Sequence, residues 1–470
     1  MVILAFMTLF AVLTACFLSL WGRPSEGIGV PIIAIAVFAW IYLCQPVYLV
    51  WNGEAQYFVT DAMIVKGVLV PAAALFFLLW GWRHGERIAP VKPLDANSSE
   101  QDWDADRLFR FGLAAACIGT VLHLMWVERS GGLAKAYGQT HGAGFDSTGF
   151  TAYIYMGSFW VLSGVAMMMA SGRKRRLAPV EHVGIALFSV AYGLSGLFLG
   201  SRHDIYAICA VLWVGWVLAK GARPTIDRAA PALAVAFFLA LLMVGYRSVL
   251  YLSNDKPDTP GWGEALTRDL EEDDVGIRYR ITGVEFLVHA AAIETIDMTQ
   301  KYDFAFNWLP VYTVHLIPRL WWERKPTLRL AQVPEEQLGP GITQADVRDT
   351  TGIRVAPGSA TGIVAEMYMS FGLFSLPFFA WVGWCAKRLL FRAERLRTPV
   401  AMCAYVMVFS LGLNAFGQGF GSILVPLPYL MAPVFLYSLV DLNSHRRWAR
   451  AQSGSPILWN LERRKARRER

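Results

Sequence analysis

Residues 62–82 read AMIVKGVLVPAAALFFLLWGW, an apolar run of 21 residues with a single charged side chain, Lys66. An α-helix of about 20 apolar residues is long enough to cross a bilayer core of about 30 Å. Lipid offers the backbone no hydrogen-bond partners, so only helices and closed barrels cross it. The run has none of the alternation that is typical of a barrel strand. It therefore predicts a membrane-spanning helix.

Runs of the same kind occur along the whole chain. Of its 470 residues, 55% are hydrophobic and 17% are charged, and the mean hydropathy is +0.39. The candidate spans are approximately 3–21, 28–50, 62–82, 108–127, 149–170, 181–199, 204–220, 230–249, 359–384, 399–414 and 421–440. The first lacks the basic region and the cleavage site of a signal peptide, so we expect it to remain as an anchor. The sequence thus predicts an all-α polytopic integral membrane protein with about 11 transmembrane helices.

Basic residues are concentrated in alternate loops, which predicts the orientation of the chain. Lys and Arg in short loops resist translocation, so the basic loops are expected to be cytoplasmic, with the N-terminus outside and the C-terminus inside. Four regions follow: helices 1–8 in residues 1–250, a large outer loop at 251–358, helices 9–11 in 359–442, and a basic cytoplasmic tail at 443–470. A loop of 108 residues exceeds ordinary connections and is the first place to look for function.

Disulfides, metals and nucleic acids find little support in the sequence. All six cysteines fall within a candidate span or directly after one, and no CxxC or zinc spacing occurs. The acidic run 271–274 is more typical of a solvated loop than of a metal site, so we expect no metal and no other cofactor. The basic tail favours anionic lipid headgroups over nucleic acid as its partner.

Arg202 is a candidate phosphate ligand at the outer surface. It lies in a tight turn between two apolar runs, and its planar guanidinium can donate two parallel hydrogen bonds to a phosphate. The alternative is an arginine that extends to the membrane interface or pairs with Asp204. Further cations on the predicted outer side are Arg247, Arg278, Arg280, Arg319, Arg324 and Lys325. The aromatic residues around the last three also suit a segment that rests on the membrane without a catalytic role.

Glu366 is the principal candidate for a general base. It lies within the ninth span, where an ionised side chain costs about 2.5–3.5 kcal/mol at the bilayer centre, so such an acid usually faces a polar cavity. The alternative is a structural partner for Arg247 or Arg202, and Lys66 is a similar but weaker case.

Two histidines are further candidates for the base. If residues 278–296 are helical, Arg278, Thr282, Glu285 and His289 share one face, which is either a reactive polar stripe or simply a solvated surface. His203 follows Arg202 directly in the outer turn.

Several motifs follow one another in a distinctive order between residues 190 and 390. A Ser-Arg turn at 201–202 is followed by a long outer loop, by the segment IPRLWWERKP at 317–326, and by the helical string EMYMSFG at 366–372. This order is the basis of a resemblance to the oligosaccharide repeat-unit (O-antigen, Wzy-type) polymerases. The 317–326 segment is its most specific part. The N-terminal helices are similar to this family only in hydropathy.

The resemblance implies a GT-C-like, inverting and metal-independent glycosyltransferase at the periplasmic face of the bacterial inner membrane. Such an enzyme moves a growing glycan from undecaprenyl pyrophosphate onto another lipid-linked repeat unit, and a chain-length regulator is a possible partner beside the membrane lipids. The residues expected to bind the pyrophosphate are Arg202, Arg247, Arg278, Arg280, Arg319 and Lys325. The expected base is Glu366, followed by His289 or His203.

Two other functions are compatible with the same sequence. An O-antigen ligase performs the same chemistry but transfers the glycan to lipid A core. A glycan transporter or flippase belongs to a different class, and it would be expected to carry cations deep within many spans. Here the intramembrane cations are few and most outer cations sit at one face, which favours the transferase.

Overall fold

A computed structural model describes residues 1–21, 28–52, 59–87, 103–132, 150–198, 202–221, 285–304, 337–339, 341–353, 355, 361–395 and 398–453. These residues are almost entirely helical. The short exception is a two-stranded antiparallel hairpin of β1 (Gln337–Gly339) and β2 (Ile342–Thr343). The described residues do not include the predicted span 230–249, nor the segments 251–284, 305–336 and 454–470.

The helices of the first half of the chain follow the hydropathy of the sequence. They are α1 (Val2–Leu20), α2 (Val30–Phe38), the π-helix η2 (Ala39–Cys44), α3 (Gln45–Trp51), α4 (Asp61–Arg87), α5 (Ala105–Arg129), α7 (Phe150–Ser158), α8 (Trp160–Ser171), α9 (Pro179–Phe198) and α10 (Arg202–Lys220). The π-helix joins α2 and α3 into one span, and such π segments are frequent at functional sites.

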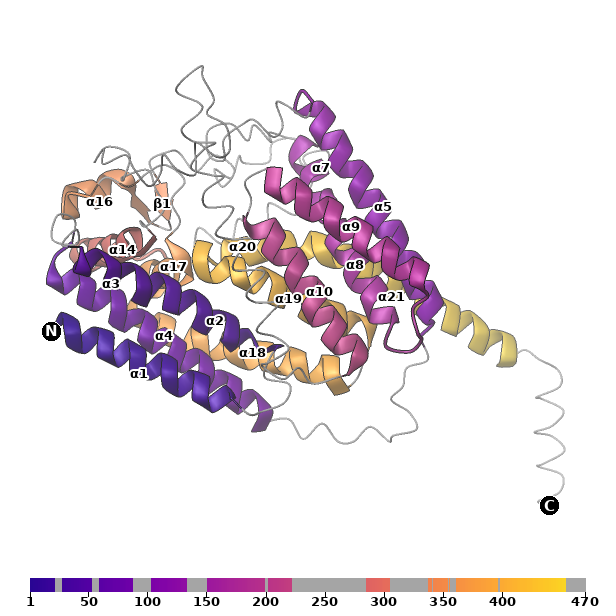
Figure 1. The fold of residues 1–470 in the computed structure, drawn as a ribbon, viewed down its shortest axis with the longest axis horizontal. Helices are drawn as coiled ribbons and strands as arrows, with labels where there is room; N and C mark the ends of the chain where they lie inside the picture. The colour runs from indigo at the N-terminus through magenta and orange to yellow at the C-terminus, as the bar shows by residue number, and fades with distance from the viewer. Residues whose placement is uncertain are drawn as a thin grey trace.

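The second half contains shorter and interrupted helices. They are α14 (Glu285–Thr299), α16 (Gln344–Thr351), α17 (Gly362–Phe371), the 3₁₀ turn η4 (Gly372–Phe374), α18 (Ser375–Arg395), α19 (Pro399–Gln418), α20 (Gly421–Leu424) and α21 (Pro426–Ser453). α14 and α16 belong to the predicted outer loop and lie together at one end of the helix bundle (Figure 1).

Nine helical segments within the described residues are long and apolar enough to cross a membrane. They are Val2–Leu20, Val30–Trp51, Asp61–Gly85, Ala105–Arg129, Tyr153–Ser171, His203–Lys220, Gly362–Arg395, Pro399–Gln418 and Gly421–Asp441. Each overlaps a predicted span, and Gly362–Arg395 extends beyond the predicted end at 384. The protein is therefore an all-α polytopic membrane protein. The predicted span 181–199 forms the helix α9, which is not among the nine.

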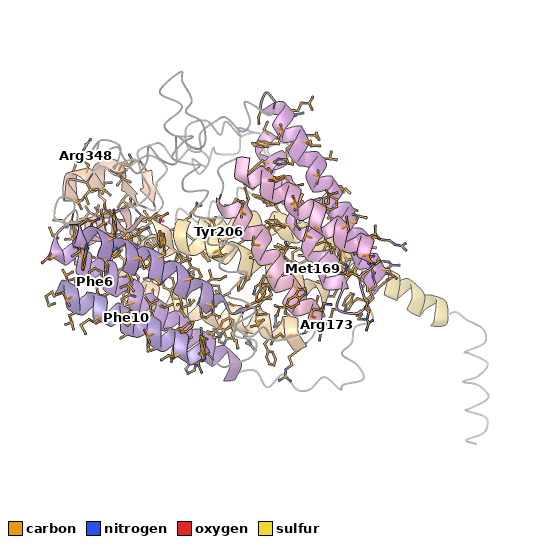
Figure 2. The ribbon with its side chains drawn as sticks, viewed as in Figure 1. Phe6, Phe10, Met169, Arg173, Tyr206 and Arg348 are labelled. Atoms are coloured by element: carbon orange, nitrogen blue, oxygen red, sulfur yellow. The ribbon has the colours of Figure 1, made fainter. Side chains whose placement is uncertain are left out.

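The exposed apolar surface of α1 is consistent with a lipid environment. Its buried residues Leu9, Leu13 and Cys16 form one stripe against the bundle. Met7 and Phe10 lie on the other side and are exposed, and Figure 2 shows Phe6 and Phe10 on this helix. A water-soluble protein seldom exposes so large an apolar patch, whereas lipid tails solvate it.

Glycines bring the spanning helices into close contact. On α5, a Cβ atom at Gly112 would lie 2.7 Å from the carbonyl oxygen of Gly164 on α8. On α18, a Cβ atom at Gly383 would overlap the carbonyl oxygen of Leu78 on α4. Small residues are common in such contacts because membrane helices associate through close van der Waals packing.

Ion pairs close the end of the bundle that carries the basic loops. Arg175 follows α8 and pairs with Glu181 of α9 at 2.6 Å and with Asp106 of α5 at 2.8 Å. Arg173 lies in the same loop (Figure 2). The hydrogen bonds that the Arg175 guanidinium donates to the Glu181 carboxylate are the main cause that raises the pKa of Arg175. These contacts fix the ends of three helices to one another.

Candidate functional site

α14 packs among other helices beside the N-terminal part of α4, at the end of α4 away from the basic loops. Gly67 of α4 leaves room for it, since a Cβ atom there would lie 3.0 Å from the Cβ atom of Ala290. At its N-terminus, Gln45 of α3 donates to the Glu285 carboxylate at 2.9 Å and accepts from the amide of Phe286 at 3.1 Å. Gln45 thus satisfies an amide that the first turn of a helix leaves without an intrahelical partner.

The sequence predicts one polar and one apolar face for this helix, but in the structure part of the predicted polar face is buried as well. Leu287, Val288 and Ala291 are buried as expected, but His289 is also fully buried. The reason is that α4, α16 and α17 cover α14 from different sides. Arg278 and Thr282 lie outside the described residues.

Lys66, Glu294, Asp297 and Tyr368 form a polar group that we call the Lys66 cluster. The Lys66 ammonium lies 2.8 Å from the Glu294 carboxylate and 2.7 Å from that of Asp297. The Tyr368 hydroxyl donates to the other oxygen of Asp297 at 2.7 Å. The side chains of Lys66, Glu294 and Asp297 remain 39%, 20% and 24% exposed. The cluster is therefore ordered but open on one side.

Residues 300–304 connect α14 to the point where α17 ends. Gly372 has φ +56°, which ends α17, and the amides of Asp303 and Phe304 donate to the carbonyls of Met369 and Ser370 at 3.3 and 3.0 Å. Gln300 and Phe304 have φ of +54° and +48°, an arrangement that costs of order 1–3 kcal/mol for a residue other than glycine. The packing of this segment against α17 maintains the strain.

Tyr302 extends this segment toward the Lys66 cluster. Its ring lies against Gly372, where a Cβ atom would come within 3.1 Å of it. Burial, and then the negative charge of Asp297, raise the pKa of the Tyr302 hydroxyl. The neighbouring Phe304 ring lies 6.1 Å from that of Tyr302, centroid to centroid, and is 62% exposed.

Glu366 lies on α17 and contacts the break between α19 and α20. Its carboxylate accepts from the backbone amides of Phe420 and Gly421. Gly419, with φ +132°, packs directly against this carboxylate, and a side chain at Gly419 would collide with it. The break between α19 and α20 leaves these amides without an intrahelical partner, and the Glu366 carboxylate supplies one within the membrane-spanning region.

His289 is held from α17 and from the π-helix. Its Nδ1 atom lies 3.3 Å from the carbonyl oxygen of Thr361 and 3.5 Å from the Tyr42 hydroxyl. A carbonyl only accepts, so this contact places the proton on Nδ1 and leaves a lone pair on Nε2. Nε2 is buried without a hydrogen-bond partner among the described residues. Burial lowers the pKa of His289 to about 3, so the imidazole is neutral.

Two of the predicted bases lie at or beside α17, although only Glu366 belongs to that helix. His289 contacts Thr361 immediately before α17, and Glu366 lies one turn further on. His203 is in the first turn of α10 and is half-buried. The backbone of Arg202 begins α10, but its side chain is outside the described part of the structure. The described residues also do not include Arg247, Arg278, Arg280, Arg319 and Lys325. Their role as pyrophosphate ligands stays a prediction.

Glu294 and Asp297 are the residues that sequence reasoning missed. They lie three residues apart on α14; Glu294 is within the stretch 278–296 that the sequence allows as a helix, and Asp297 is one residue beyond it. A lysine within a span requires a partner. These two signals together point to an ion pair, but not to which acids form it. In the described ranges, no group of three His, Cys, Asp or Glu side chains is arranged to hold a metal ion.

Comparison of the chain with protein-family models, with curated proteins and with solved structures found no match.

Proposed function

We propose that the protein is an integral-membrane polysaccharide polymerase. It transfers a growing glycan from undecaprenyl pyrophosphate to a second lipid-linked repeat unit at the periplasmic face of a bacterial inner membrane. The observation that supports this most is that His289 contacts Thr361, directly before α17, and that Glu366 lies on α17 about one turn further along the chain. Both belong to the stretch that resembles the polymerases, and the predicted cations Arg319 and Lys325 lie in the chain between α14 and α17.

The proposed reaction is a displacement at the anomeric carbon of the donor. The oxygen of an acceptor hydroxyl forms the new bond, the bond to pyrophosphate breaks, and the leaving oxygen keeps the electron pair. Arg and Lys side chains stabilise the negative charge that develops on the pyrophosphate. Glu366 takes the acceptor proton, and attack from the opposite face inverts the anomeric centre.

The test is a reconstitution of the purified protein with synthetic undecaprenyl-pyrophosphate repeat units. A ladder of products on a gel is the expected result. A single transfer that requires lipid A core as acceptor would identify a ligase instead. No transfer to either acceptor, by protein that is folded and monodisperse, would contradict the proposal.

Interrupted helices favour a transporter as the second candidate function. The break between α19 and α20 at Gly419 contacts Glu366, and the break between α17 and α18 at Gly372 follows six residues after Glu366 in the chain. Substrate sites of transporters are typically formed by such interrupted helices. Proteoliposomes distinguish the two functions. Movement of a fluorescent lipid-linked oligosaccharide between leaflets, without any ladder, would support the transporter.

A further inference from the structure

The break after α19 leaves two backbone carbonyls of this helix without their usual partners. In a continuous α-helix each amide donates to the carbonyl four residues earlier. The amides of Phe420 and Gly421 donate to the Glu366 carboxylate instead. Among the described residues, no backbone amide beyond α19 donates to the two carbonyls left over, those of Phe416 and Gly417. The end of α19 therefore presents two acceptors at the negative end of its helix dipole.

Both carbonyls face the start of α17 at a position that has no side chain. Gly362 has φ +74°, and a Cβ atom there would lie 3.4 Å from the Phe416 oxygen and 3.5 Å from the Gly417 oxygen. The Tyr42 hydroxyl oxygen, from η2, lies 3.2 Å from the same position. Tyr42 is fully buried and Phe416 is 2% exposed. Oxygens from two elements thus converge on the space that a third element, α17, leaves open at a glycine.

The chemistry of these oxygens favours a monovalent cation as their ligand. Carbonyl oxygens coordinate K⁺ in channel filters, and the carbonyls of interrupted helices coordinate Na⁺ in transporters. Mg²⁺ and Ca²⁺ usually take several carboxylates or retained waters, so neutral oxygens suit them less. One carboxylate is close by, because Glu366 lies four residues after Gly362 on the same face of α17. Its negative charge attracts a cation and repels an anion.

We infer that the Tyr42 hydroxyl and the carbonyls of Phe416 and Gly417 bind a monovalent alkali cation, Na⁺ or K⁺, in the space beside Gly362. The bound ion links η2, the end of α19 and the start of α17, so it stabilises the break that Glu366 contacts. The site does not depend on glycan transfer, because the ion binds the folded chain itself.

Thermal unfolding of the full chain in a neutral detergent tests the site. NaCl or KCl replaces N-methylglucamine chloride at constant total chloride, so that general screening stays the same. A ligand that binds only the folded state stabilises it, so raising Na⁺ or K⁺ about 100-fold should raise the unfolding midpoint by roughly 2 °C or more. Tyr42→Phe should reduce this rise. Tyr437→Phe is the matched control and should keep it, since Tyr437 is also buried and its hydroxyl donates to the carbonyl of Asp104.

A second pair of variants fills the space with a methyl group. Gly362→Ala should abolish the rise. Gly352→Ala should keep it, because Gly352 has the same φ of +74° but nothing lies within 4 Å of a Cβ atom there. The pair thus has equal backbone strain and differs in the oxygens that the methyl group meets. If Gly362→Ala does not fold, the comparison of Tyr42→Phe with Tyr437→Phe decides.

Equal midpoints in NaCl, KCl and N-methylglucamine chloride would overturn the cation site, as expected if water fills the space. A rise that survives in both Tyr42→Phe and Gly362→Ala would also overturn it, because the ion would then bind elsewhere. The ladder assay separates this result from the proposed function. A ladder without any cation-dependent midpoint would retain the polymerase and contradict the site, and the reverse result would retain the site alone.

Discussion

At the scale of single residues, Glu366 combines a structural contact with its proposed catalytic role. The substitution Glu366→Gln keeps an oxygen that accepts from the Phe420 amide, so the turn after α19 should stay folded. It removes the basicity, so turnover in the ladder assay should fall by about 10²-fold or more, as for the loss of a general base. Glu394→Gln, at an exposed site near the end of α18, is the control and should leave turnover unchanged.

The alternative base has a defined signature in the same assay. If Glu366→Gln retains turnover while His289→Ala abolishes it in folded protein, the imidazole takes the proton. Glu366 would then serve only the backbone of the break between α19 and α20.

Lys66 compensates two carboxylates, so its removal should destabilise the fold. Lys66→Met leaves Glu294 and Asp297 facing each other without a cation. Loss of one partner of a buried pair costs about 3–5 kcal/mol, and partial exposure here should reduce this to roughly 1–2 kcal/mol. Unfolding in detergent measures the loss. The triple variant Lys66→Met, Glu294→Gln, Asp297→Asn should recover most of it, and a triple variant no more stable than the single one would show that the ion pairs are not the cause.

The ion pair between Asp346 and Lys301 predicts that the local stability of α16 depends on pH. The Lys301 ammonium at 2.7 Å, and then the Thr343 amide, hold the pKa of Asp346 below its ordinary value. A carboxyl with a lowered folded-state pKa stabilises the fold above its unfolded pKa and loses this effect as the pH falls through the folded value. Hydrogen-exchange protection of α16 should therefore decline below about pH 4. Asp346→Asn should remove that decline, whereas Asp349→Asn, on the exposed side of the same helix, should keep it.

At the scale of elements, close helix contacts through glycine determine which spans lie together. Gly383→Val would force α18 away from the carbonyl of Leu78 on α4, and such overpacking costs about 1–3 kcal/mol or more. The expected result is a lower unfolding midpoint and a lower yield of monodisperse protein. Gly184→Val is the control, because nothing lies within 4 Å of a Cβ atom at that position on α9. Equal losses in both variants would point to helix propensity rather than to packing.

At the scale of the whole molecule, the positive charges predict which end of the bundle faces the outside. In a cysteine-free background, Lys301→Cys should react with a membrane-impermeant thiol reagent added to intact spheroplasts, because Lys301 is exposed beside α14 at the predicted outer end. Arg392→Cys, exposed near the end of α18, should react only after the membrane is opened. The reverse labelling pattern would invert the topology and place the proposed site in the cytoplasm.

The sequence by itself determined that the chain is helical and crosses a membrane, because hydropathy is a property of consecutive residues. Residues 62–82 are enough to predict most of α4, and the same reasoning places the other long apolar helices. Only the tertiary structure decided which polar groups meet. Lys66 and Glu294 are 228 residues apart, and Glu366 is 54 residues from Phe420. Partners in space depend on how helices pack, on where Gly372 and Gly419 interrupt them, and on the burial of α14, none of which local composition specifies.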